Sequence, residues 1–307
     1  MTEMPAPPLQ PTGPMPFRLL LDEAMRHARR HFRAIFPSVA IPVAILASTI
    51  QAAQARWFSR LTGGLAQSPQ NPLAFWSPEI LALTLVYSVV LIVAYFTMQV
   101  AALDALAGRP VDMARAWRFT VRPRALGTIL LWYAATVASL ICCLLPVLYV
   151  APLLSFVPPV MVEEGRFGFQ ALSRSAELTR FNPGRRLLDH PLVKVLVLLL
   201  VGMLITYLLG LIVSLPFAIP MWVDMFRKAF AGGDVMQGMS KWIWLQVPAQ
   251  LLNALASTAV YLYVCFGIAL LFNDTRGRKE GTDLRASIEA LFPAPSPPSP
   301  PPGEPAP

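Results

Sequence analysis

Acidic and basic side chains that could form a polar site lie in two short stretches of this chain. The first stretch contributes Glu163, Arg174 and Glu177, and the second contributes Asp274, Arg276, Arg278, Glu280 and Asp283. Carboxylates and guanidinium groups form strong charge-assisted hydrogen bonds with one another. Acids beside an anionic lipid surface would be repelled by it, so we expect those of the second stretch to pair with arginines. The two stretches should therefore meet in space as one polar cluster.

A second set of polar residues recurs at helical spacing inside an apolar segment. This polar stripe consists of Gln246, Gln250, Asn253 and Ser257. An amide without a partner is costly in hydrocarbon, so the stripe should face protein or water. It is either a set of interhelical hydrogen bonds, with Gln99 as a potential partner, or the lining of a polar or lipid-headgroup cavity.

Residue sets typical of catalysis or metal binding do not occur in the sequence. There is no nucleophile, phosphate-loop or zinc-hydrolase motif. His27 and His31 have a metal-compatible spacing, but they stand among five arginines that would repel a cation. Cys142, Cys143 and Cys265 lie in apolar segments without a paired framework. We therefore expect no cofactor, no metal site and no enzymatic activity.

The composition predicts a membrane protein. Hydrophobic residues make up 55% of the chain and charged residues 14%, whereas a soluble globular chain has about 25% charged residues. A span needs ~20 apolar residues. Six segments meet or approach this length, at about 35–55, 79–107, 125–145, 147–162, 192–220 and 243–272. The fourth is short and contains Pro152, so it either crosses fully or is re-entrant.

Other segments have the pattern of surface elements. An amphipathic helix with a basic face is predicted over 17–36, and shorter interfacial helices are predicted over 111–119 and 167–181. The stretch 221–242 should form an outer loop, because Trp222 and Trp242 near its ends fit an aromatic belt.

The domain organisation follows from these segments. Pro-rich ends at 1–16 and 292–307 are predicted to be disordered. Between them, residues 17–291 should form one integral membrane domain. The predicted fold class is all-α: a polytopic membrane helix bundle of about six transmembrane helices plus amphipathic interfacial helices.

Lys and Arg residues divide unequally between the two sides of this arrangement. If six segments cross, 20 of the 25 lie on the side of the N-terminus and the other five on the opposite side. Such an excess marks the cytoplasmic face. The sequence therefore predicts a multi-pass protein of the cell (inner) membrane with both termini in the cytoplasm. This anchoring explains the net charge of +8, so no nucleic-acid partner is expected.

Two motifs resemble those of a known family. The run Asn273–Leu284 is similar to the closing signature YYDxRxRKEGxDL of a bacterial membrane family related to the membrane domain of glycerophosphoryl diester phosphodiesterases, although Asn273 replaces the usual Tyr. Met161–Gly165 followed by Ala171–Thr179 resembles that family's vvEg…AlkRSweLtkG segment. The sequence lacks the catalytic phosphodiesterase domain. The resemblance therefore implies an integral membrane module without hydrolase activity.

The function expected from these features is that of a non-enzymatic integral membrane protein, associated with lipid or the envelope or binding a partner. A small-solute or lipid transporter is the alternative, which inverted internal repeats would favour. We find no convincing repeat of this kind in the sequence. Expected partners are membrane lipids and either another membrane protein or a second copy of the chain.

Overall fold

The computed structural model describes residues 15–65, 78–142, 144–180, 190–232 and 242–281. All regular secondary structure in these ranges is helical. Six of the helices are long and apolar enough to cross a membrane. The predicted all-α class is confirmed, and the protein is a multi-pass integral membrane helix bundle.

Ten helical elements follow one another along the described chain. They are α1 (Phe17–Leu65), α2 (Pro78–Leu106), α3 (Met113–Thr120), α4 (Pro123–Cys142), α5 (Leu144–Leu153), α6 (Val157–Glu163), α7 (Phe169–Thr179), α8 (Pro191–Phe230), the 3₁₀ turn η3 (Ile243–Leu245) and α10 (Gln246–Glu280). Candidate spans lie on α1, α2, α4, the α5–α6 segment, α8 and η3–α10. The Pro-rich ends predicted over 1–16 and 292–307 lie outside the described residues, apart from Met15 and Pro16.

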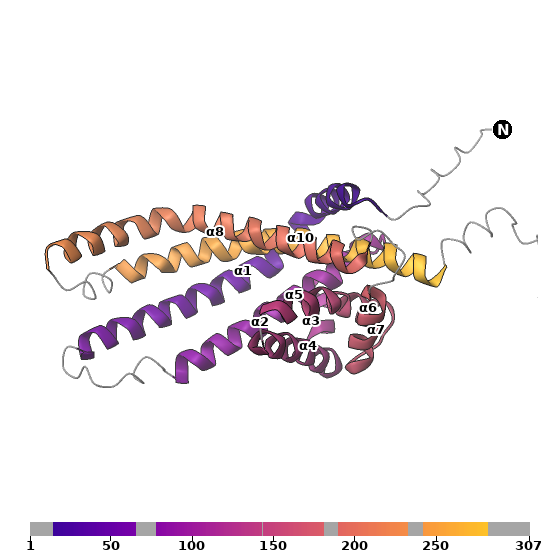
Figure 1. Ribbon diagram of the computed structural model, residues 1–307, viewed down its shortest axis with the longest axis horizontal. Helices are drawn as coiled ribbons and strands as arrows, with labels where there is room; N and C mark the ends of the chain where they lie inside the picture. The colour runs from indigo at the N-terminus through magenta and orange to yellow at the C-terminus, as the bar shows by residue number, and fades with distance from the viewer. Residues whose placement is uncertain (1–14, 66–77, 143, 181–189, 233–241, 282–307) are drawn as a thin grey trace, which may run out of the picture.

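The surface elements gather toward one end of the bundle. Figure 1 shows the first turns of α1, the short helices α3, α6 and α7, and the last turns of α10 toward this end, while the long helices α1, α2, α8 and α10 extend toward the other. We call the first the basic end, because the arginines of α3, α7 and α10 lie there. The loops after α2 and α6 thus lie at the same end of the bundle, in agreement with an even number of crossings between them.

The centre of the bundle is α10. Of its most apolar stretch 67% is buried inside the protein, against 17% for α4 and for α8. It packs against α1, α2 and α8. Two glycines bring α8 and α10 close together: a Cβ on Gly202 would lie 2.6 Å from Val264, and one on Gly267 would lie 2.6 Å from Leu198. Small residues at such contacts are typical of helix pairs in membranes.

The first amphipathic segment and the first span form one helix, which differs from the two separate elements expected. The helix α1 runs without interruption to Leu65 and contains Pro37 and Pro42. An internal proline removes a backbone hydrogen bond and bends a helix. The first turns of α1 accordingly run in a different direction from the rest (Figure 1).

The prediction of an outer loop over 221–242 is wrong for the first half of this stretch, because α8 continues to Phe230. Its 40 residues make about 60 Å of helix, twice the ~30 Å of the hydrocarbon core. The extension is supported by contacts of Asp224, which accepts a hydrogen bond from Trp242 Nε1 at 3.0 Å and pairs with Lys228 Nζ at 3.6 Å. Local apolar content alone did not indicate these contacts.

The segment that follows α4 and leads back to the basic end is not one straight helix. It consists of α5 and α6, which are separated at Leu154–Phe156, and α5 contains Pro152. Figure 1 shows that the α4–α5 hairpin ends well before the far ends of α1 and α8. The broken segment nevertheless brings the chain back to the basic end, as both predicted alternatives required.

Candidate functional site

Arg174 on α7 joins the two predicted charged stretches. Its side chain is 14% exposed. Its Nε donates to Glu164 Oε2 at 3.0 Å, one terminal nitrogen donates to Glu177 Oε2 at 3.2 Å, and the other donates to Glu280 at the end of α10. Lys279 of α10 adds a bond to the backbone carbonyl of Glu177. The predicted meeting of the two stretches is confirmed.

The surroundings of Arg174 keep it charged. Burial by itself would lower the pKa of the guanidinium, but the hydrogen bonds to Glu177 and Glu164 outweigh that effect and raise the pKa above its ordinary value. A permanently charged arginine that binds three carboxylates is a fixed connector between α7 and α10. We call Arg174 with Glu164, Glu177 and Glu280 the α7 latch.

The other described members of the predicted cluster also form ion pairs, one of which shares Glu280 with the latch. Arg276 pairs with Glu280 at 3.1 Å, and Arg278 pairs with Asp274 at 2.8 Å, both within α10. Glu163 lies 2.7 Å from Arg109 and does not join the latch. Asp283 lies outside the described residues. The predicted cluster therefore holds for Arg174, Glu177, Arg276 and Glu280, whereas Glu163 belongs to a different group of ion pairs.

The acid that holds Arg174 from α6 is Glu164, which we did not predict. Its side chain is 8% exposed, and it also pairs with Arg166 at 3.2 Å. Glu163 and Glu164 are adjacent at the end of α6, where successive side chains point about 100° apart. One therefore faces the loop after α2 and the other faces α7. The sequence shows both acids but does not show which of them points to α7.

A second buried acid, Asp104 near the end of α2, also escaped prediction. It is 1% exposed, and its Oδ1 lies 3.5 Å from Arg109 and 3.8 Å from Arg115. Arg109 also contacts Glu163. These ion pairs connect the end of α2 with α3 and α6, so the inner loop of 107–112 is tied to the bundle by charge.

The short helix α3 is built to expose arginines. Asp112 caps it by accepting hydrogen bonds from the amides of Ala114 at 2.9 Å and Arg115 at 3.1 Å. Its buried face consists of Ala116 and Thr120, and the Thr120 hydroxyl lies 2.9 Å from that of Thr97 on α2. With one face fixed to α2, the opposite face of α3 presents its arginines outward.

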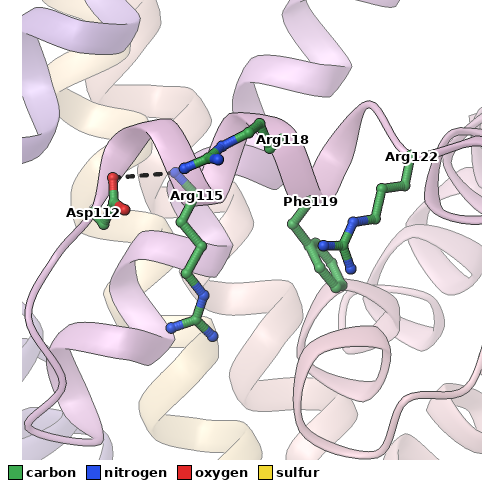
Figure 2. A pocket seen from close by; sticks show the side chains of 5 residues that line it. All are labelled: Asp112, Arg115, Arg118, Phe119 and Arg122. Carbon is green, nitrogen blue, oxygen red and sulfur yellow. Dashed lines mark hydrogen bonds between the residues drawn. The ribbon is translucent and has the colours of Figure 1, made fainter.

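A hollow of about 510 Å³ lies beside α3. Its lining residues are Asp112, Arg115, Arg118, Phe119 and Arg122 (Figure 2). The Arg118 Nε donates to the carbonyl of Ala114 at 3.2 Å, and the Arg122 guanidinium stands 6.0 Å from the centre of the Phe119 ring. We call this the α3 hollow. Arginines are suited to bidentate binding of phosphate and carboxylate groups.

A second hollow, of about 560 Å³, lies beside α7. It is lined by Arg166, Phe169, Gln170, Ser173, Arg174 and Glu177. Both of its arginines are paired with carboxylates of the protein. We call this the α7 hollow.

The polar stripe lies partly against α8. Asn253 faces Gly210, because a Cβ built on that glycine would lie 3.0 Å from Asn253 Oδ1. The prediction that Asn253 points into the bundle is confirmed, and all four stripe residues are half-buried. The suggestion that Gln99 is a partner of the stripe is wrong, because its Nε2 donates to the Tyr95 hydroxyl of its own helix at 3.1 Å.

The described residues contain no group of three His, Cys, Asp or Glu side chains placed to hold a metal ion. The rings of His27 and His31 stack near Phe266 of α10, with centroids 6.0 and 6.1 Å away. Both histidines therefore pack the first turns of α1 against the central helix.

Comparisons with protein-family models, with curated proteins and with solved structures found no match. The resemblance of the two motifs to the glycerophosphoryl diester phosphodiesterase membrane domain thus stays a prediction. The function has to be argued from the geometry of the basic end.

Proposed function

We propose that this protein is a non-enzymatic membrane protein of the cell (inner) membrane that binds anionic lipid headgroups at its cytoplasmic surface. The observation that carries the proposal is the α3 hollow, which three arginines line. The basic end is the cytoplasmic end in this proposal, because 20 of the 25 Lys and Arg residues lie on that side of the predicted topology.

The location of the α3 hollow favours a lipid ligand. It lies on a short helix between α2 and α4, both of which are candidate spans. The residues of α3 therefore sit near the level at which a helix leaves the hydrocarbon and meets the headgroups. Basic residues at this level attract anionic lipids with about 1 kcal/mol for each Lys or Arg near the surface.

Retained lipid provides the direct test. Protein purified in mild detergent from a membrane containing phosphatidylglycerol and phosphatidylcholine should keep the anionic lipid in native mass spectra. Replacement of Arg115, Arg118 and Arg122 by Gln should abolish this preference, because the hollow then loses its charge. Equal retention of both lipids by the unchanged protein would contradict the proposal.

The orientation has its own test. In a background without the native cysteines, a cysteine at position 233 should react with an impermeant thiol reagent in intact cells, and one at position 184 should not. Reaction at position 184 alone would place the basic end outside, where the proposed cytoplasmic lipid contact could not form.

Transport is the second candidate, and one observation favours it. Gln99 is fully buried, and its Oε1 has no hydrogen-bond partner among the described residues. The Oδ1 atom of the half-buried Asn253 also has no hydrogen-bond partner there. Unpaired acceptors inside a bundle could accept hydrogen bonds from a polar group that crosses the membrane.

A fluorescent phospholipid in reconstituted vesicles should then change leaflets faster with the protein than without it, and Asn253→Leu should slow this exchange at nearly unchanged thermal stability. Lower stability with unchanged exchange would instead make the stripe structural.

A further inference from the structure

We infer that the α3 hollow selects a terminal phosphate dianion, such as a phosphate monoester or a diphosphate, over a phosphodiester with a single charge. The inference rests on the proposed function and makes its ligand specific. The same chemical group can come from a lipid headgroup or from a soluble phosphate compound, and the experiment below separates these sources.

The α3 hollow contains arginines that no acid of the described residues pairs with. It is lined by three arginines and one carboxylate, that of Asp112, and one of the three, Arg115, already lies 3.8 Å from Asp104. The Asp112 carboxylate already accepts hydrogen bonds from two backbone amides at the start of α3. In the described part of the chain, neither Arg118 nor Arg122 forms an ion pair with an acid. Two arginine charges therefore remain without an ion pair in the described residues, and a dianion matches two charges better than a monoanion does.

The two classes of phosphate also differ in the number of hydrogen-bond acceptors that they offer to the arginines. A terminal phosphate offers three acceptor oxygens, whereas a phosphodiester keeps two that are not esterified. Each guanidinium has several N–H donors, so a terminal phosphate can accept from more than one nitrogen of Arg118 and Arg122. Arg118 is held along α3 by its bond to Ala114, and Arg122 stands over the Phe119 ring. Part of the cost of ordering these two side chains is thus met before a ligand arrives.

Arg115 is placed beside the hollow by a buried acid of α2. Its guanidinium lies 3.8 Å from Asp104 Oδ1, and Asp104 is 1% exposed. We assign Asp104 the role of a positioning residue that keeps Arg115 near the hollow without occupying the hollow itself. The volume of about 510 Å³ is within the ~300–1,000 Å³ range of small-molecule sites, and it leaves room for more than one phosphate group.

The experiment compares three lipids on the full-length protein in mild detergent. Equimolar phosphatidic acid, phosphatidylglycerol and phosphatidylcholine are offered together, and the bound lipid is counted by native mass spectrometry. We expect phosphatidic acid to be retained over phosphatidylglycerol by about tenfold, which corresponds to ~1.4 kcal/mol. The double variant Arg118→Gln/Arg122→Gln should retain the two acids equally.

A matched control removes the same charge elsewhere at the basic end. Arg29→Gln/Arg30→Gln changes two exposed arginines of α1 and should keep the preference for phosphatidic acid. Both double variants alter exposed side chains, so unchanged thermal unfolding in detergent verifies that they fold. An equal loss of preference in the control would overturn the assignment to the α3 hollow.

A soluble arm identifies the source of the phosphate. Inorganic pyrophosphate is titrated calorimetrically into the lipid-depleted protein and into the Arg118→Gln/Arg122→Gln variant. Pyrophosphate binding that the variant loses, without retention of any anionic lipid, would support the dianion site and contradict the lipid function. Equal retention of phosphatidic acid and phosphatidylglycerol, both above phosphatidylcholine, would support the lipid function and overturn the dianion preference.

Discussion

The two hollows at the basic end are similar in size but differ in how their arginines are paired. The α7 hollow contains Arg174, which is bound by three carboxylates of the protein. The α3 hollow contains Arg118 and Arg122, for which the described residues supply no acid. An arginine whose partners are internal stabilises the fold, whereas an arginine without an internal acid is available to a ligand. In the proposed function, α7 accordingly holds the bundle together and α3 provides the binding site.

The N-termini of α3 and α7 also differ in where their hydrogen-bond partners come from. Asp112 caps α3 from within its own sequence. Helix α7 begins at Gly168 without a side-chain cap, and the amide of Gly168 instead donates to Thr128 of α4 at 2.8 Å. Local residues therefore define α3, and tertiary contacts define α7. We expect α7 to depend on its neighbours and α3 to depend on Asp112.

The largest expected effect is on stability at the α7 latch. Arg174→Ala leaves Glu164, whose side chain is 8% exposed, without its buried partner, and breaking such a pair costs roughly 3–5 kcal/mol. Because Glu177 and Glu280 stay accessible to water, the lower end of this range is expected. The measurement is thermal unfolding in detergent. Arg166→Ala is the control: its side chain is 49% exposed, and it should cost about 0–1 kcal/mol.

The same latch variant also tests the division of roles. Arg174→Ala should keep the preference for phosphatidic acid measured below its unfolding temperature. If the preference is lost while α3 remains folded, the two hollows act together and the proposed contrast is wrong.

An intermediate effect is expected at the start of α3. Asp112→Ala removes the N-cap, which costs about 0.5–2 kcal/mol of helix stability. Amide hydrogen exchange over Met113–Thr120 should become faster, and retention of phosphatidic acid should fall because the arginines lose their common face. Ser173→Ala in the α7 hollow serves as the matched control and should leave both the hydrogen exchange of α3 and the retention of phosphatidic acid unchanged. Unchanged exchange in Asp112→Ala would mean that the contact with Thr97 alone holds α3.

The smallest effect is expected at Asp104. Asp104→Asn removes a negative charge 3.8 Å from Arg115, whose side chain is 53% exposed. Exposed pairs contribute about 0–1 kcal/mol, so loss of the positioning contact should lower retention of phosphatidic acid by no more than about fivefold. A matched change at Asp274, which pairs with Arg278 on α10, should not alter it. A rise in retention with Asp104→Asn would show that Asp104 competes with the ligand for Arg115 and does not position it.

The sequence by itself determined the class, the approximate spans and the gathering of arginines at one end. Apolar length and charge placement are local properties, and a bilayer selects on them directly. The pairing of the segment around Arg174 with the end of α10 was also predictable, because unlike charges at one membrane surface are expected to meet. Even α3 could be located locally, since Pro110 and Asp112 precede a short amphipathic run.

The tertiary structure alone decided which partners these residues take. Glu164 rather than Glu163 reaches Arg174, and Asp104 is buried where it approaches Arg115. Both outcomes depend on the direction of a side chain around its helix axis and on how closely the neighbouring helix packs, and neither is encoded by spacing within one segment. For the same reason the sequence showed five arginines in the inner loop after α2 but could not show that Arg118 and Arg122 would form no ion pair with an acid of the described chain. Whether an arginine is available to a ligand is a property of the packed helices.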